Sequence, residues 1–280
     1  MKIAIVGVGL IGGSLALSLK KAKLATHIIG VDNNEEHIAQ ALDMGIIDSA
    51  TTLKDALGSA DLIVLAVPVT AIQSLLPSIL DQISESQTVI ELGSTKKDIL
   101  LSVENHPRRG RLVASHPMAG TEYSGPEAAV EDLYKGKNMV FCDITQTEDD
   151  AFEVAENICE ALGMNPVFMH AHEHDLHTAY VSHISHITSF ALALTVLEKE
   201  KSQGRIFELA SGGFASTVRL AKSSADMWIP IFKQNRTNIL EVLEEHIKQL
   251  QGIHRALDTE DFDALYKLVK QSNKIRRIIK

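Results

Sequence analysis

The stretch Gly7-Val8-Gly9-Leu10-Ile11-Gly12-Gly13 decides the fold of this chain. An apolar run rich in β-branched residues precedes it at positions 1–6, and a segment with helical spacing follows it at 14–22. A strand, a glycine turn and a helix in this order are the context that a dinucleotide-binding fingerprint requires. We therefore expect the chain to begin with a nucleotide-binding unit.

Three glycines of the turn have a physical reason to be there. Gly7 permits a tight turn, Gly9 lets a pyrophosphate approach bare backbone, and Gly12 lets the helix lie close to the strand. The N–H groups at the start of the helix and the positive end of its dipole then face the phosphates. The expected cofactor-binding residues of the turn are Gly7, Gly9, Leu10, Ile11 and Gly12.

The choice between NAD and NADP depends on the end of the second strand. Residues 27–31 form that expected strand, and Asp32 follows it, twenty residues after Gly12. A carboxylate there accepts hydrogen bonds from both ribose hydroxyls and repels a 2′-phosphate, which favours NAD. NADP stays open as the alternative, because Asn33 and Asn34 could serve a phosphate.

Length and composition narrow the class of protein. The chain has 280 residues, enough for two cores, and 45% hydrophobic with 22% charged residues is ordinary for a globular protein. A net charge of −9 argues against nucleic-acid and anionic-membrane partners. The two cysteines, Cys142 and Cys159, have neither a disulfide nor a zinc spacing. With no signal-like segment and no apolar run of spanning length, we expect a cytoplasmic protein without a membrane partner.

Strand-like runs recur between helical segments over the first half, at 62–67, 87–91 and 111–114. This alternation predicts an α/β fold with a doubly wound, Rossmann-type parallel sheet, whose ligands gather at the carboxyl ends of the strands. Val67 and Pro68 end one run, while Ser94 and His116 follow the other two. We expect all of them on the edge that holds the glycine turn, with Val67, Pro68 and Ser94 near the cofactor.

The second half has a different pattern. Strands at 138–142 and 166–169 flank a helix at 149–162, and from Ala171 the helical period continues to the end of the chain. We predict an NAD-binding domain at 1–170 and an all-helical substrate-binding and dimerisation domain at 171–280. The helical segments are expected at 172–201, 206–211, 223–256 and 259–278. Their long apolar faces favour burial against a second copy of the chain, and hence a homodimer.

A polar stripe is expected on the first long helix. Asp175, Ser182 and His186 are spaced so that a regular helix returns each to within about 20° of the first, with His183 at the border. A solvated face is the alternative to a functional one. The same segment is rich in histidine, but no HExxH-type pattern accompanies it, and we expect no metal site.

Three residues have the chemistry for an oxidation next to a bound dinucleotide. His116 lies in a Ser-His-Pro turn and has the ordinary pKa range of a base that takes a hydroxyl proton while hydride leaves. Ser94 could orient the same hydroxyl. Arg219, which follows a glycine-rich break, has a guanidinium fork that suits a carboxylate, although surface placement is the alternative. Trp228 is expected to pack in the core nearby.

Together these stretches resemble the prephenate/arogenate dehydrogenases of tyrosine biosynthesis, in the form without fused domains. The resemblance covers the chain from end to end, in the family's order. It rests on Gly7 to Ser14, Leu92-Gly93-Ser94-Thr95-Lys96, Ser115-His116-Pro117-Met118-Ala119-Gly120-Thr121, His174-Asp175, Ser182-His183-Ile184-Ser185-His186, Gly212-Gly213-Phe214, Arg219 and Trp228.

The resemblance implies an NAD-dependent oxidative decarboxylation of prephenate to 4-hydroxyphenylpyruvate and CO2. It implies that His116 hydrogen-bonds the C4 hydroxyl of the substrate, that Ser94 supports it, and that Arg219 binds a carboxylate. It further implies a substrate pocket to which the dimer partner contributes a glycine. The implied pocket residues are Asp175, Ser182, His183, His186, Thr121 and Gly212.

Departures from the family pattern leave alternatives. Ser185 stands where the family often has Pro, and 214–218 lacks the charged residues that often precede the Arg. L-Arogenate is therefore the alternative substrate, and prephenate is favoured because a His-rich pocket suits an anionic pyruvyl tail. A β-hydroxyacid dehydrogenase would need a Lys, which 172–197 lacks. A non-catalytic NAD(H) sensor would not need His116, Ser94 and Arg219 together. We expect neither a preceding chorismate mutase segment nor a following regulatory ACT domain.

Overall fold

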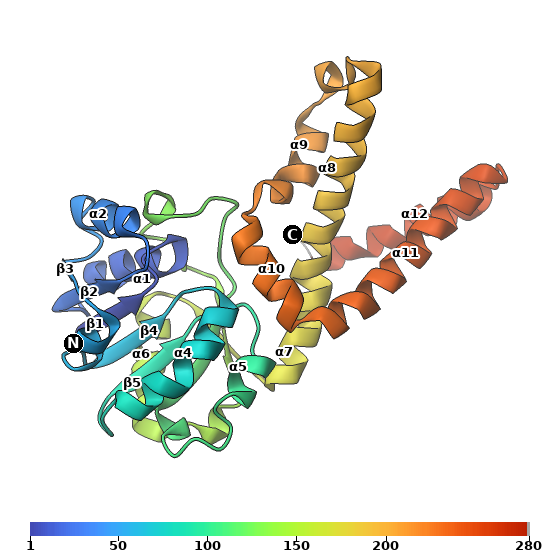
Figure 1. Ribbon diagram of the computed structural model, residues 1–280. Coiled ribbons are helices and arrows are strands. Elements are labelled where there is room, and N and C mark those ends of the chain that lie inside the picture. The colour runs from blue at the N-terminus through green and yellow to red at the C-terminus, as the bar shows by residue number, and fades with distance from the viewer. Residues whose placement is uncertain (279–280) are drawn as a thin grey trace. The chain divides into compact units, whose positions relative to one another are not determined.

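A computed structural model describes residues 1–278, and its N-terminal part is built around one eight-stranded sheet (Figure 1). The strand order is β3-β2-β1-β4-β5-β6-β7-β8. The strands are β1 (Lys2–Val6), β2 (His27–Val31), β3 (Ser49–Ala50), β4 (Leu62–Leu65), β5 (Thr88–Glu91), β6 (Leu112–Pro117), β7 (Asn138–Cys142) and β8 (Asn165–Met169). The Rossmann-type fold class is confirmed.

Two strands, β7 and β8, run opposite to the other six. β7 pairs antiparallel with β6, while every other neighbouring pair is parallel. A parallel neighbour would need a long crossover, usually a helix, but the connection from β6 to β7 contains only the short 3-10 turn Pro126–Ala128. The chain therefore turns back beside β6 instead of crossing over the sheet.

Helices cover both faces of the sheet, because the strands are apolar on both sides. Along β1, Ile3 and Ile5 belong to one buried cluster while Ala4 and Val6 belong to the other. The helices of this half are α1 (Leu10–Lys21), α2 (Glu35–Asp43), α3 (Leu53–Leu57), α4 (Val69–Gln82), α5 (Lys97–Leu101) and α6 (Asp149–Ala161).

The remaining described chain is helical, as expected, but two of the expected helices are interrupted. The helix expected at 172–201 contains a π-helical turn, Ala179–His183, and the one expected at 223–256 breaks at Asn235. The segment expected at 206–211 is a short 3-10 turn, Ile206–Leu209. The helices are α7 (Ala171–Thr178), α8 (Ile184–Gln203), α9 (Gly212–Val218), α10 (Ala225–Gln234), α11 (Arg236–Asp258) and α12 (Phe262–Ser272).

Contacts divide the chain into two compact units, Met1–Arg236 and Thr237–Lys280. The first unit holds the sheet together with α7 to α10, and the second holds most of α11 and all of α12. Inside the first unit, Gln234 at the end of α10 bonds the carbonyl of Val69 and the side chain of Thr95. The domain boundary near His170 stays a prediction. Residues 279 and 280, the last two of the predicted helical domain, lie outside the described residues.

The run from α7 to α8, Ala171–Gln203, is long and apolar enough by length and composition to cross a membrane, the one such helix among residues 1–278. Its first turns are tied to the sheet by buried polar contacts of His174 and Asp175. Its far end carries exposed leucines, including Leu194 and Leu197. A helix of this composition also occurs where a soluble protein buries the exposed side against another chain.

Candidate active site

The glycine turn after β1 is built so that backbone alone fills it. Gly7 has a φ of +94°, and a Cβ there would lie 2.5 Å from the carbonyl oxygen of Ala66. A Cβ on Gly12 would lie 1.9 Å from the carbonyl oxygen of Gly7, so any side chain would push α1 off the strand. At Gly9, by contrast, the nearest atom to a Cβ is 3.9 Å away, which leaves the open space that a pyrophosphate needs.

Asp32 lies beside this turn, at the end of β2. Its carboxylate accepts hydrogen bonds from the backbone N–H of Val8 at 3.1 Å and of Asn34 at 2.9 Å, which fix it next to the turn. The side-chain oxygen of Asn34 caps α2 by accepting from two backbone N–H groups. The first turn of α2 carries Glu35 and Glu36. This surrounding of acids suits ribose hydroxyls and opposes a 2′-phosphate.

The other expected residues lie in a row along the same edge of the sheet as the glycine turn. β2, β1, β4, β5 and β6 are neighbours in that order and run parallel, so their carboxyl ends share an edge. Val67 and Pro68 follow β4, and the half-buried Ser94 follows β5. His116 is the second-to-last residue of β6, whereas the sequence predicted that it follows the strand. Three strand spacings, about 14 Å, separate β1 from β6, a distance that an extended dinucleotide can cover.

His116 is the end of a buried chain of hydrogen bonds. Its Nδ1 lies 2.8 Å from Nε2 of His174, and Nδ1 of His174 lies 2.8 Å from Oδ1 of Asp175. Burial, helped by the charge of nearby Lys96, holds the pKa of His116 well below its usual value. Burial also lowers the pKa of His174. Both imidazoles are therefore neutral near pH 7, as a base must be before it accepts a proton.

Asp175 does not line a polar stripe with Ser182 and His186, as the regular helix predicted. The π-helical turn at 179–183 adds about one residue to the helix and shifts everything after it. Asp175 is 2% exposed, and its carboxylate accepts the backbone N–H groups of Lys96 at 2.8 Å and Lys97 at 2.9 Å. It therefore caps the start of α5 and supports His174 from behind.

Aromatic and imidazole rings gather on α8 and α10. Buried His183 lies 3.1 Å through Nδ1 from the side-chain nitrogen of Asn235, and burial lowers the pKa of His183 to about 4. His186 donates from Nδ1 to the carbonyl oxygen of Ser182 at 3.0 Å, and its ring lies 3.7 Å from that of Trp228. Trp228 is buried, as expected, and its Nε1 has no hydrogen-bond partner among the described atoms. These rings form a largely apolar surface that contains the ring nitrogens of the histidines and of Trp228.

Arg219 is half-exposed, and its guanidinium bonds a carboxylate oxygen of Glu122 at 2.6 Å. The backbone of Glu122 and the Arg219 guanidinium lower the pKa of that carboxyl. Glu122 follows the exposed Thr121 in the loop after β6, so the pair joins the loop to the helical half. Gly212 begins α9, with no atom within 4 Å of a Cβ built there. Sequence reasoning missed Glu122, whose only signal was its position directly after the Ser-His-Pro stretch.

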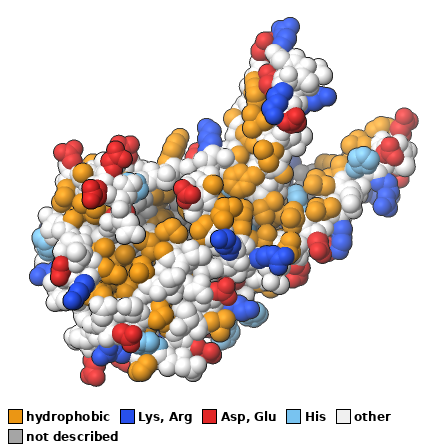
Figure 2. All heavy atoms as spheres, viewed as in Figure 1, with side chains coloured by type: hydrophobic (Ala, Val, Ile, Leu, Met, Phe, Trp, Pro, Cys, Tyr) orange, Lys and Arg blue, Asp and Glu red, His pale blue; other side chains and the backbone are white. Residues whose placement is uncertain are grey.

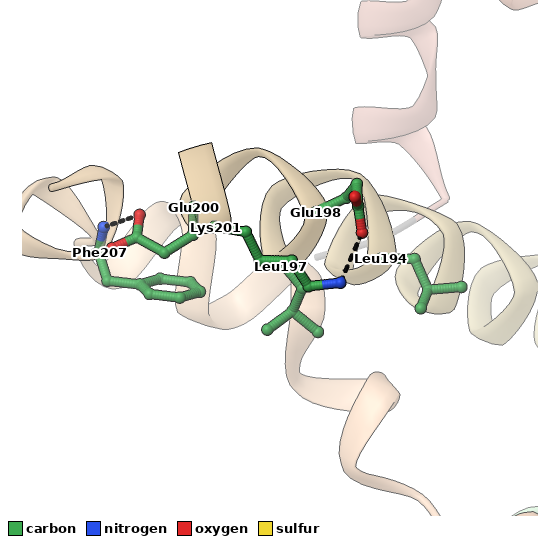
Figure 3. Close-up of a pocket in the computed structure, with 6 residues that line it drawn as sticks. All are labelled: Leu194, Leu197, Glu198, Glu200, Lys201 and Phe207. Carbon is green, nitrogen blue, oxygen red and sulfur yellow. Dashed lines mark hydrogen bonds and ion pairs between the residues drawn. The ribbon is translucent and has the colours of Figure 1, made fainter. Parts of the chain in front are cut away.

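A separate hollow of about 470 Å³ lies near the far end of α8. Figure 3 shows its lining, which comes from α8 and the turn that follows: Leu194, Leu197, Glu198, Glu200, Lys201 and Phe207. It begins eight residues beyond His186, about 12 Å along the helix axis, and its lining includes none of the expected catalytic, substrate-binding or cofactor-binding residues. Across residues 1–278, no group of three His, Cys, Asp or Glu side chains is arranged to hold a metal ion.

The fold and this site define a class, the dehydrogenases that bind a dinucleotide across the edge of a Rossmann-type sheet. The comparison with protein families narrows the class. The model of the prephenate dehydrogenase nucleotide-binding domain matches residues 15–167, and that of the prephenate dehydrogenase dimerization domain matches residues 170–271. The chain belongs to the prephenate dehydrogenase family.

Individual relatives are similar over nearly the whole chain. A prephenate dehydrogenase of Bacillus subtilis is 31% identical over 98% of this chain and 75% of its own length. The structure of prephenate dehydrogenase from Aquifex aeolicus in complex with hydroxyphenyl propionate and NAD+ superposes with a TM-score of 0.90 at 32% identity, covering 100% of this chain and 98% of that one. An arogenate dehydrogenase of Synechocystis superposes with a TM-score of 0.78 at 25% identity, covering 100% of both chains.

Proposed function

We propose that this protein catalyses the NAD-dependent oxidative decarboxylation of prephenate to 4-hydroxyphenylpyruvate and CO2. The observation that carries the proposal is His116, a neutral imidazole on the sheet edge that also holds the glycine turn and Asp32. Its Nδ1 is engaged by His174, which leaves Nε2 to meet a substrate. The family, and the relatives that carry this name, support the same reaction.

In the proposed reaction, His116 accepts the proton of the C4 hydroxyl at Nε2, and Ser94 orients that hydroxyl. Bound NAD+ supplies the acceptor for the hydride that leaves C4. Once C4 is a ketone, the bond from the ring to its carboxylate breaks, CO2 leaves, and the electron pair moves to the C4 oxygen, which takes back the proton held by His116. Aromaticity drives this step, so the protein needs no second base for decarboxylation. Its task is to hold C4 near the cofactor and to take one proton.

Cationic and polar side chains must collect a substrate with two carboxylates, because the chain carries a net charge of −9. Arg219 is the proposed partner of one carboxylate, which would compete with Glu122 for the guanidinium. Ser182, His183, His186 and Thr121 are proposed to complete the pocket. Asp175 is proposed to act from behind His174, because its carboxylate is buried.

The testing experiment follows NADH absorbance with purified protein and NAD+, with prephenate and L-arogenate offered in parallel and each repeated with NADP+. We expect turnover of prephenate with NAD+, and a much weaker response with NADP+ because of Asp32 and the acids of α2. Turnover of arogenate alone would replace the substrate, and silence with both while NAD+ binds would overturn the proposed reaction.

The carboxylate contact of Arg219 gives a prediction about substrate affinity. Arg219→Ala should raise the KM for prephenate about 10- to 100-fold, the loss of a hydrogen-bonded charge pair, with a smaller effect on kcat. Arg205→Ala is the matched control, because Arg205 is an exposed arginine that pairs with neighbouring Glu208 in its own turn. Steady-state kinetics of both variants decide it, and an unchanged KM in Arg219→Ala would place Arg219 outside the substrate site.

We also propose that two copies form a homodimer through the helical half, and that Gly212 of one copy adjoins the pocket of the other. Hydrophobic side chains are exposed along α8 (Figure 2), where Leu194 is 66% and Leu197 51% exposed. A second copy of this chain is the occupant we favour, because the matching family model for this region is a dimerization domain.

The dimer proposal predicts that Leu197→Glu yields monomers, because it places a charge in the apolar face of α8. Leu101→Glu is the control, since Leu101 is equally exposed, at 54%, but lies on α5 of the nucleotide-binding half. Sedimentation at micromolar concentration should find dimers for the wild type and the control. A monomeric wild type, or a dimer that survives Leu197→Glu, would contradict the proposal.

A further inference from the structure

We infer that His174 is a positioning residue: held by Asp175, it fixes the tautomer of His116 so that Nε2 of His116 is the open base. The inference rests on the proposed role of His116 and adds to it the device that makes the role possible. It starts from two contacts of 2.8 Å, His116 to His174 and His174 to Asp175.

The donors and acceptors in this chain can be assigned from its far end. The Asp175 carboxylate only accepts, so Nδ1 of His174 must donate to it. A neutral His174 then has a bare Nε2, which can only accept. The partner across the 2.8 Å contact, Nδ1 of His116, must therefore carry the hydrogen. A neutral His116 with its hydrogen on Nδ1 has a lone pair on Nε2.

Asp175, at the far end of this series of hydrogen bonds, is held rigidly and is shielded from water. Asp175 also accepts the backbone N–H groups of Lys96 and Lys97, two donors that cannot rotate away. His174 is 1% exposed, which keeps water from offering it another partner. The hydroxyl of Thr178 donates to the carbonyl oxygen of His174 at 3.0 Å and stays on the helix side. With two backbone N–H groups holding it, the carboxylate of Asp175 orients the ring of His174, and that ring orients His116.

The chain of bonds also fits the state that the reaction creates. When the substrate O–H bond breaks, a new N–H bond forms at Nε2 of His116, and the ring becomes an imidazolium. Its Nδ1–H continues to donate to Nε2 of His174, a contact that is stronger when the donor is charged. His174 itself stays between the cation and the Asp175 carboxylate. The same bond therefore selects the base form and stabilises the acid form.

Two variants of His174 separate positioning from packing. His174→Gln places an amide oxygen near the site of Nε2, so it can still accept from His116, whereas His174→Asn can keep the contact to Asp175 but offers nothing to His116. We expect His174→Asn to lower kcat about 10- to 100-fold with little change in the KM for prephenate or NAD+. His174→Gln should keep kcat within a few-fold of the wild type. Equal losses in both variants, or no loss in either, would overturn the inference.

A nitrogen NMR measurement tests the tautomer without substrate. In histidine-labelled protein, we expect the His116 signals to have a protonated Nδ1 and a bare Nε2, with His116→Asn used to assign them. His174→Asn should shift His116 toward a mixture of tautomers. A protonated Nε2 in the neutral wild type would overturn the inference. Because this readout needs no turnover, a protein that ignores prephenate yet has the expected tautomer would fail the proposed function and leave the tautomer assignment standing.

Discussion

His116→Asn should lower kcat for prephenate about 10²- to 10⁴-fold, the range that a positioned general base contributes, and leave the KM nearly unchanged. Asn retains a polar group near the site of Nδ1, but it has no group at the site of Nε2 that accepts a proton near neutral pH. Because the imidazole acts on a proton that moves only in the transition state, ground-state binding should depend on it little. Initial rates over a range of prephenate at saturating NAD+ measure both constants.

The dependence of kcat on pH supplies a second readout. Burial holds the pKa of His116 well below 6.5, so its base form persists as the pH falls. We expect the wild-type kcat to stay level from pH 8 to about 6 and to fall only as His116 takes a proton below that range. The variant should lack this limb. His172→Asn is the control, because His172 is exposed on α7 and should change neither constant. A rise in KM alone would contradict the role.

The nucleotide-binding half was predictable because its signals are local. The glycine turn, the flanking strand and Asp32 lie within one βαβ unit, and the geometry of parallel strands then sets where their carboxyl ends meet. The same rule placed Ser94 and His116 on the correct edge. The antiparallel pairing of β7 with β6 was not predicted, because the sequence of residues 138–142 does not indicate the direction of the strand that pairs with it.

The inner layer of the site was less predictable, because it depends on contacts between distant segments. His174 contacts His116 across 58 positions, and Asn235 reaches back 60 positions to the backbone of Asp175. Neither the composition nor the periodicity of the sequence ahead of Ile184 indicates a π-helical turn. This turn nevertheless decides which side chains share a face of the helix. Periodicity assumes a regular helix, and it failed at Asp175 for that reason.

A buried ion pair lies next to the end of β6 that carries His116. Lys96 and Glu91 are fully buried and bonded to one another, and Nζ of Lys96 also donates to the carbonyl oxygen of Ser115, next to His116. Glu91 accepts the backbone N–H of Gly93 at 2.9 Å. Burial raises the pKa of Glu91, and the Lys96 charge opposes that shift. Each charge is tolerated in this position only because the other is present.

Lys96→Met should therefore lower the free energy of unfolding by about 3–5 kcal/mol near pH 8, because it leaves the Glu91 carboxylate buried without a counterion. Urea unfolding measures the loss, with Lys97→Met as the control, since Lys97 is exposed at the next position. Without Lys96 the folded-state pKa of Glu91 rises further above its unfolded value, so the folded protein binds a proton as the pH falls. The deficit relative to the wild type should then be smaller at pH 5 than at pH 8. Adding Glu91→Gln to Lys96→Met should recover part of it at pH 8, and a deficit that neither low pH nor Glu91→Gln reduces would show that the lost lysine acted through packing alone.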